Sequence, residues 1–149
     1  TPMTKDVIIE KNTLLPEEYI ELREHVQWGG PEKDDAKQAL ESSLVVFAAR
    51  VNGKLAGSVR IIGDNKLCFY IQDLMVFSSM RKQGIATKLI QMAMQYISGH
   101  AAHNAYIGLM SAKGLEGFYE KFGFMRRPNE KLGCGMIMFY GRPAELTEE

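Results

Sequence analysis

Residues 70–87 constrain the fold of this chain more than any other stretch, because an apolar strand leads there through a basic, glycine-bearing turn into a helix. After Gly84 the apolar residues recur at spacings of three and four, which predicts one face of an amphipathic helix. They are Ile85, Leu89, Met92, Ala93, Tyr96 and Ile97. The first N–H groups of a helix lack intrahelical partners and carry the positive end of the helix dipole. The turn therefore predicts a phosphate-binding site.

The residues of the turn suit a diphosphate. Gly84 and Ala86 remove the side chains that would hold a ligand away, while Arg81, Lys82 and Gln83 add hydrogen-bond donors. No Gly-Lys-Ser/Thr stands at the turn, which excludes a P-loop, and the Gly-x-Gly-x-x-Gly fingerprint of dinucleotide-binding folds is absent. The predicted site consists of Arg81, Lys82, Gln83, Gly84, Ile85, Ala86 and Thr87.

The strand before the turn breaks its own alternation at Asp73. Side chains alternate between the two faces of a strand, so Phe69 and Ile71 share one face, and Leu74 and Val76 fall on the other. One extra residue near Asp73 restores a single apolar face, which predicts a β-bulge. The alternative is an ordinary strand with one polar residue at its edge.

Two motifs together resemble the GNAT superfamily of N-acetyltransferases. Arg81-x-x-Gly84-x-Ala86 after Leu74-x-Val76 is similar to the pyrophosphate motif of that family, which takes an acetyl group from acetyl-CoA. Phe118-Tyr119-x-x-x-Gly123-Phe124 resembles its second motif, on a short helix that packs beside the coenzyme. The resemblance covers residues 7–140 and is closest to small bacterial stand-alone acetyltransferases.

The resemblance implies an α+β fold with three α/β layers. A mixed, mostly antiparallel sheet of six to seven strands is expected between about four helices, with a V-shaped splay between the fourth and fifth strands. Periodicity and turn residues predict strands at 7–9, 44–51, 54–62, 67–76, 105–110 and 136–140. They predict helices from Pro16 through Val26, at 32–42, at 84–98 and at 115–122.

The family also implies roles for single residues. The pantetheine arm is expected along the backbone of Leu74 and Val76, with the thioester oxygen held by an N–H near Leu74 or Met75. Phe118 and Tyr119 are expected beside the coenzyme, and Tyr119 is the predicted general acid for the departing thiolate. Helical spacing alone favours the alternative, a core aromatic residue with its hydroxyl at the edge, and the family match reverses that preference.

The attacking amine must lose a proton, because an alkyl amine with a pKa near ~10.4 is mostly charged at neutral pH. Asp73 is the predicted base, directly or through water ordered with Tyr70 and Gln72; the alternative is a carboxylate that satisfies the bulge. Trp28, Tyr70 and Gln72 are the predicted acceptor-binding residues. Acidic residues opening the second helix would suit a cation, but their commoner role is to complement the helix dipole. They are Glu32, Asp34 and Asp35.

Composition sets the remaining expectations. A chain of 149 residues with 46% hydrophobic content predicts a single domain over 1–149, with a frayed acidic tail at 143–149. Eighteen basic residues balance eighteen acidic ones, which argues against nucleic acid as a partner. Two cysteines and three histidines show no metal-ligand spacing, and no transmembrane or targeting segment is visible, so we expect a cytoplasmic enzyme without a metal.

The sequence is compatible with two functions. The first is an acetyl-CoA-dependent N-acetyltransferase acting on a primary amine of a small molecule or peptide, by direct attack in a ternary complex. The alternative is a non-catalytic acyl-CoA-binding module of the same fold. Acceptor, acyl-chain preference and a homodimeric state are left open.

Overall fold

The computed structural model describes residues 6–143 and divides the chain into two compact units, Thr1–Leu109 and Met110–Glu149. Most of the predicted acidic tail, residues 144–149, lies outside the described residues. The single domain over 1–149 stays a prediction.

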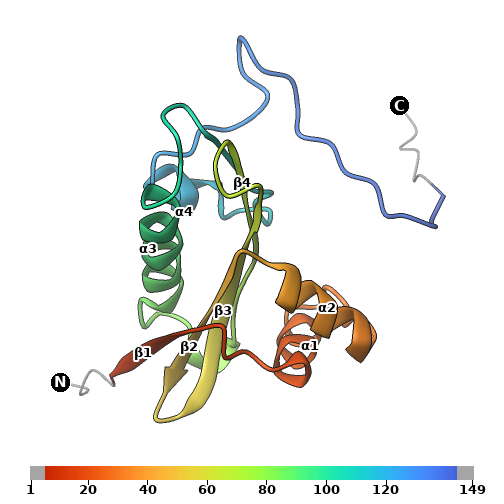
Figure 1. The fold of residues 1–149 in the computed structure, drawn as a ribbon, viewed down its shortest axis with the longest axis vertical. Coiled ribbons are helices and arrows are strands. Elements are labelled where there is room, and N and C mark those ends of the chain that lie inside the picture. The colour runs from red at the N-terminus through yellow and green to blue at the C-terminus, as the bar shows by residue number, and fades with distance from the viewer. Residues whose placement is uncertain (1–5, 144–149) are drawn as a thin grey trace. The chain divides into compact units, whose positions relative to one another are not determined.

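The first unit is built on one five-stranded sheet in the order β1-β2-β3-β4-β5 (Figure 1). The first four strands pair antiparallel, and β5 is parallel to β4 because the chain crosses over through a helix between them. The strands are β1 (Val7–Lys11), β2 (Val45–Val51), β3 (Lys54–Gly63), β4 (Cys68–Val76) and β5 (Tyr106–Gly108).

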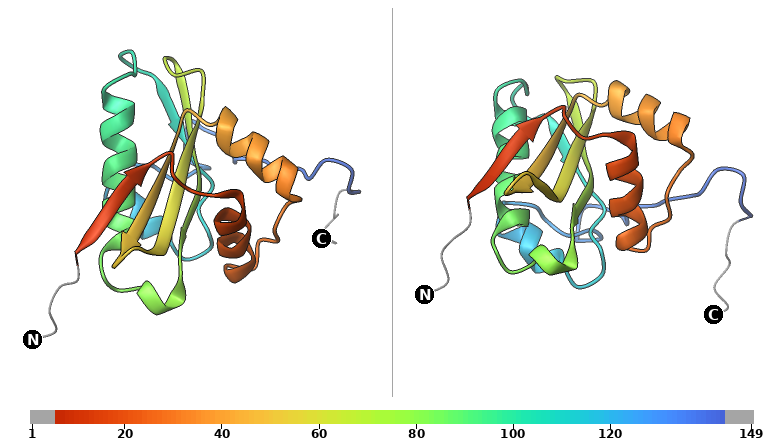
Figure 2. Two further views of the ribbon diagram at one scale, coloured as in Figure 1. Left: turned by 60° about the horizontal axis from the view of Figure 1, so that its bottom comes forward. Right: turned by 90° about the horizontal axis from the view of Figure 1, so that it is seen from below.

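Helices cover both faces of this sheet. Helix α3 (Ile85–Ser98) lies on one face, and α1 (Pro16–His25) and α2 (Lys33–Ser42) lie on the other (Figures 1 and 2). The apolar stripe predicted from the sequence explains why α3 docks, since its inward positions are buried against the strands. The buried residues of the predicted stripe are Ile85, Leu89, Ala93 and Ile97, whereas Met92 and Tyr96 are only partly buried. Ile90, which the predicted stripe did not include, is also buried. The mixed α+β architecture is therefore confirmed for this unit.

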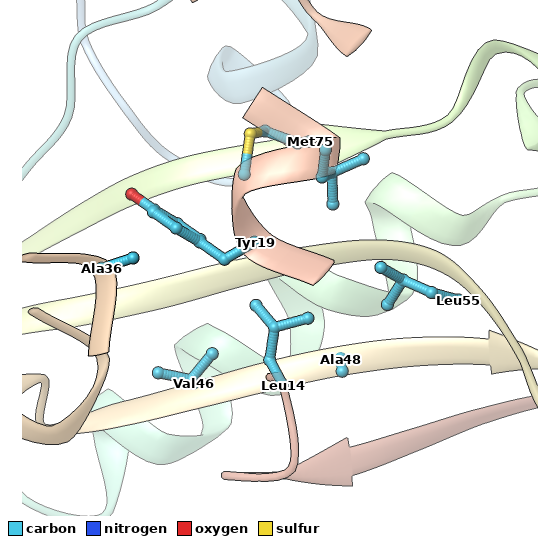
Figure 3. Packing of buried hydrophobic residues seen from close by; sticks show 8 residues of the cluster. Leu14, Tyr19, Ala36, Val46, Ala48, Leu55 and Met75 are labelled. Atoms are coloured by element: carbon cyan, nitrogen blue, oxygen red, sulfur yellow. The ribbon is translucent and has the colours of Figure 1, made fainter. Parts of the chain in front are cut away.

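A compact cluster of apolar side chains fixes α1 on the sheet. Tyr19 and Leu22 of α1 are buried, and Val26, just after the helix, is partly buried against the same cluster. Figure 3 shows Tyr19 beside Met75 of β4, with side chains of β2 and β3 below them. Burying a leucine-sized side chain contributes roughly 1.5 to 3 kcal/mol, so this contact holds α1 across β4.

Charged groups join α1 to the far side of the sheet. The guanidinium of Arg50 on β2 donates to both oxygens of Glu18 in α1, at 2.8 and 2.9 Å, and to Glu10 of β1 at 2.8 Å. Glu18 also accepts from the N–H of Leu15, which caps the start of the helix. The Arg50 hydrogen bonds lower the pKa of the Glu18 carboxyl.

The prediction of six to seven strands is wrong, because the chain has five in the residues that the structure describes. The segment 136–140 forms no strand, and its side chains are exposed, from 57% at Phe139 to 101% at Tyr140. A strand needs a neighbour for its backbone groups, and no strand of residues 110–143 offers an edge. The strand predicted at 105–110 is also shorter, since β5 has only three residues.

The second unit contains α4 (Glu116–Glu120), shorter than the predicted helix at 115–122. Aromatic rings pack within this unit: the centre of the Phe118 ring lies 5.2 Å from that of Tyr119 and 5.3 Å from that of Phe122. Gly123, three residues after the end of α4, has φ 95°, in the left-handed region that favours glycine. In residues 6–143 no helix has the length and apolar character needed to cross a membrane.

Candidate functional site

The turn between β4 and α3 has the conformation that its glycine predicts. Gly84 is the N-cap of α3 and has φ 76°, a left-handed conformation that side chains disfavour. Lys82, two residues earlier, also has positive φ, at 64°. The first intrahelical bond of α3 runs from the N–H of Lys88 to the carbonyl of Gly84, so the N–H groups of residues 85–87 have no partner within the helix.

A hollow of about 220 Å³ opens above these N–H groups. A Cβ on Gly84 would meet no atom within 4 Å, so the space over the glycine is open. Positive charge from Arg81 and Lys82 and the dipole of α3 act on the same space. The lining residues are Val76, Met80, Arg81, Lys82, Gly84, Ile85, Ala86 and Thr87. Of the predicted turn residues, only Gln83 does not line the hollow.

The predicted bulge in β4 is present. Met75 pairs with Ser58 and Gln72 with Arg60, so the single residue Val59 faces both Asp73 and Leu74. Asp73 has φ 57°, which is uncommon for a residue with a side chain. The extra residue turns Val76 to the face of β4 that carries Ile71, as the alternation in the sequence predicts. Val76 pairs with Gly57 and Ile71 pairs with Ile61, and residues 57 and 61 lie on one face of β3.

Strand β4 continues past its pairing with β5. Only Cys68, Phe69 and Tyr70 pair with β5, and β4 runs on for six more residues to Val76. Within residues 6–109 this edge of β4 has no paired strand beyond Tyr70. Its backbone groups at Leu74 and Val76 are those that the family resemblance assigns to a pantetheine arm. The side chain of Met75 points away, into the cluster under α1 (Figure 3).

The Asp73 carboxylate is buried, with 1% of its side chain exposed, and both its oxygens accept hydrogen bonds. Oδ1 accepts from Arg23 Nη1 and from Gln72 Nε2, each at 2.9 Å. Oδ2 accepts from Arg60 Nε at 2.9 Å and from the Tyr19 hydroxyl. Burial first, and then the negative charge of Asp73, raise the pKa of Tyr19, so its hydroxyl stays a donor at neutral pH.

These contacts favour the structural role that the sequence left open for Asp73. Two guanidinium groups neutralise the carboxylate and hold it in the bulge. Sequence reasoning missed Arg23 and Arg60 and did not assign Tyr19 to the site. The signal was partly visible, because Tyr19 and Arg23 are four residues apart and share a helix face. The partner Arg60 required the strand register.

The predicted acceptor residues lie on the α1 side of the first unit. Tyr70 pairs with Ile62 and Gln72 with Arg60, and residues 60 and 62 face α1. Trp28 stands in the loop between α1 and α2, with 44% of its surface exposed. The helix start with Asp34 and Asp35 is exposed, as the dipole interpretation predicts.

Tyr119 lies in the second unit, where its ring packs against those of Phe118 and Phe124. The ring centres are 5.2 and 6.2 Å apart. The residue is 8% exposed, and burial raises the pKa of its hydroxyl. No three His, Cys, Asp or Glu side chains in residues 6–143 are grouped so as to hold a metal ion.

Sequence comparison decides the family. Residues 30–139 match the family model of the acetyltransferase (GNAT) domain, which is most of the chain. The chain belongs to the GNAT acetyltransferase family. No curated protein matches the sequence significantly.

Solved structures of GNAT proteins agree with this assignment. A probable acetyltransferase of unknown function from meticillin-resistant Staphylococcus aureus is 27% identical, with a TM-score of 0.82 over 91% of this chain and 100% of that one. A GNAT-family acetyltransferase from Streptococcus pneumoniae is 25% identical, with a TM-score of 0.71 over 92% of this chain and 100% of that one. An aminoglycoside N-acetyltransferase in complex with CoA, 16% identical, shares the fold, with a TM-score of 0.65 over 97% and 99% of the two chains.

Proposed function

We propose that this protein is an acetyl-CoA-dependent N-acetyltransferase that transfers the acetyl group to a primary amine of a small molecule or peptide in a ternary complex. The hollow over Gly84 carries the proposal. There, unpartnered helix N–H groups, two cations and the open space above a glycine meet at the motif that the sequence assigns to a pyrophosphate. The aminoglycoside N-acetyltransferase solved in complex with CoA, which shares the fold, supports the choice of ligand.

The residues present fit the coenzyme in two places. The turn from Arg81 to Thr87 would bind the diphosphate through backbone N–H groups and the charges of Arg81 and Lys82. The unpaired edge of β4 would bind the pantetheine arm through the backbone of Leu74 and Val76, as one added strand binds another. The coenzyme supplies an acetyl group as a thioester.

In the reaction, the neutral amine nitrogen forms a bond to the thioester carbonyl carbon, and the carbon–sulfur bond then breaks. An N–H near Leu74 or Met75 would stabilise the oxygen that becomes negative. Tyr119 would donate its hydroxyl proton to the departing sulfur. The proton lost by the amine leaves through a base or ordered water, so the step needs no oxidant or reductant.

The hydrogen bonds of the Asp73 carboxylate determine the role that we propose for it. A base needs a free lone pair aimed at the amine, whereas both oxygens of Asp73 already accept from the side chains of Arg23, Gln72 and Arg60. We therefore place it as the group that holds the bulge, and we give base catalysis to water near Tyr70 and Gln72. Trp28 would contact the acceptor from the loop after α1.

The binding site is tested by calorimetry with acetyl-CoA on Gly84→Val. The variant should lose affinity by tenfold or more, about 1.4 kcal/mol, because valine is strained at this positive φ and adds bulk to a residue that lines the hollow. Gly53→Val is the matched control. Gly53 also has positive φ, at 75°, and also has open space, but it lies in the hairpin turn between β2 and β3. Equal affinity in the two variants would show that the coenzyme binds elsewhere.

The activity is tested by release of free thiol from acetyl-CoA with amines, polyamines, aminoglycosides and peptides as acceptors. We expect at least one class to give turnover that Gly84→Val loses and Gly53→Val keeps. Coenzyme binding without turnover on any acceptor would instead support a non-catalytic acyl-CoA-binding module.

A further inference from the structure

Arg23 in α1 holds two separate parts of the first unit with one side chain. Its Nη1 donates to Asp73 Oδ1 at 2.9 Å, in the bulge of β4. Its Nε donates to the carbonyl of Gly29 at 2.8 Å and its Nη2 to the carbonyl of Trp28 at 3.1 Å, in the loop after α1. All three nitrogens of the planar guanidinium are therefore engaged, a geometry that lysine cannot reproduce.

The loop that carries Trp28 depends on this arginine. Gln27 has φ 65° and Gly29 has φ 76°, so the chain turns sharply on both sides of Trp28. The N–H of Trp28 donates to the carbonyl of Arg23 at 3.0 Å, and the guanidinium lies 5.9 Å from the centre of the Trp28 ring. The same residue thus fixes the backbone and the side chain of the loop.

The other end of the contact is the part of β4 proposed to hold the coenzyme. Asp73 immediately precedes Leu74, and its positive φ sets the direction of the backbone there. Helix α1 touches the same segment again beyond β4. The ring nitrogen Nε2 of His25 accepts from the N–H of Ser78 at 3.0 Å, and the ring lies 5.0 Å from that of Phe77. Helix α1 therefore contacts both the bulge of β4 and the segment that follows the strand.

We propose that Arg23 is a positioning residue that couples the Trp28 loop to the coenzyme-binding edge of β4. The inference rests on the proposed function. A coenzyme bound along Leu74 and Val76 restrains the bulge, the Asp73–Arg23 contact transmits that restraint, and the carbonyls of Trp28 and Gly29 follow. Coupling between two binding sites is reciprocal, so an acceptor held by the loop also strengthens coenzyme binding.

The sequence provides the probe, because Trp28 is the only tryptophan of the chain. Acetyl-CoA is titrated into the protein while Trp28 emission is recorded, and calorimetry measures the Kd independently. We expect the emission to change along the same binding curve. In Arg23→Lys most of this change should be lost, while the calorimetric Kd stays within about threefold, as expected for a substitution that does not touch the ligand.

Arg50→Lys is the matched control. Arg50 also joins α1 to the sheet through carboxylates, Glu18 and Glu10, but contacts neither Asp73 nor the Trp28 loop. Arg50→Lys should keep the change in Trp28 emission on acetyl-CoA binding. Thermal melting shows whether Arg50→Lys and Arg23→Lys are folded. Acrylamide quenching of Trp28 in the unmodified protein, with and without acetyl-CoA, needs no variant and should change on binding.

The outcomes separate the two proposals. Binding by calorimetry with unchanged emission and unchanged quenching in the unmodified protein overturns the coupling and leaves the proposed function intact. An emission change that persists in folded Arg23→Lys also overturns it. Absence of acetyl-CoA binding in the unmodified protein overturns the proposed function itself.

Discussion

Tyr119 carries the largest chemical role in the proposal, and one atom tests it. Tyr119→Phe removes the hydroxyl and keeps the ring contacts with Phe118 and Phe124. If Tyr119 protonates the departing sulfur, kcat should fall about 10²-fold or more, with acetyl-CoA affinity nearly unchanged. Steady-state kinetics with the best acceptor measures the first quantity, and calorimetry measures the second.

The pH profile gives a second measure of the same role. An acid must be protonated to act, and burial raises the pKa of Tyr119, so the decline in rate should lie above the ordinary tyrosine value of about 10. Tyr119→Phe should lack this alkaline limb. The control is Tyr96→Phe, which removes a hydroxyl that donates to Asn65 in the first unit and should keep the limb. Near-normal kcat in Tyr119→Phe would leave the ring as a packing residue.

At the residue scale, the sequence predicts what the backbone dictates and misses what the tertiary contacts supply. Gly84 was recognisable because only a residue without a side chain suits that turn. Asp73 was recognisable because it breaks the alternation of its strand. Arg23 and Arg60 were not, because the charged partner of a buried carboxylate is set by strand register and helix docking.

At the scale of elements, β4 is the strand on which the site depends, and Asp73→Asn tests what holds its bulge. An amide cannot neutralise Arg23 and Arg60, so the variant should lose on the order of 3 kcal/mol of unfolding free energy. If Asp73 only positions the strand, kcat should fall equally at all pH values. Urea unfolding and a pH profile of kcat are the measurements.

The control for this variant is Asp64→Asn, in the turn before β4. Asp64 is exposed, and its Oδ1 accepts from the N–H groups of Lys66, Leu67 and Cys68. The variant therefore shows the effect of removing a carboxylate charge that no arginine in residues 6–143 neutralises. It should lose less stability and keep normal kinetics. Normal stability in Asp73→Asn together with loss of the acidic limb of the profile would identify Asp73 as the base.

The elements themselves show where periodicity suffices. Helix α3 and strands β2 to β4 lie within two residues of their predicted bounds, because buried stripes and hairpin turns are local signals. The prediction of a strand at 136–140 is wrong, because five consecutive apolar residues favour an extended strand without specifying which strand it would pair with. The predicted length of β5 is wrong for the same reason, since the pairing of β5 with β4 ends at Gly108.

At the scale of the whole molecule, the single domain predicted for residues 1–149 makes a claim about cooperativity. Residues of the proposed site occur in both compact units, with the turn in the first and Tyr119 in the second. If the units form one domain, they should unfold in one transition. Trp28 reports on the first unit. A tryptophan placed by Phe122→Trp in a Trp28→Phe background reports on the aromatic cluster of the second.

We expect the two reporters to give the same melting temperature. A coenzyme that contacts both units should also raise both transitions together. At a concentration 100 times its Kd, acetyl-CoA stabilises the folded state by about 2.7 kcal/mol, or roughly 5 to 10 °C for a chain of this length. A rise seen by Trp28 alone would mean that residues 110–149 unfold separately from the coenzyme site. The general acid would then have to be sought in ordered water near β4 rather than in Tyr119.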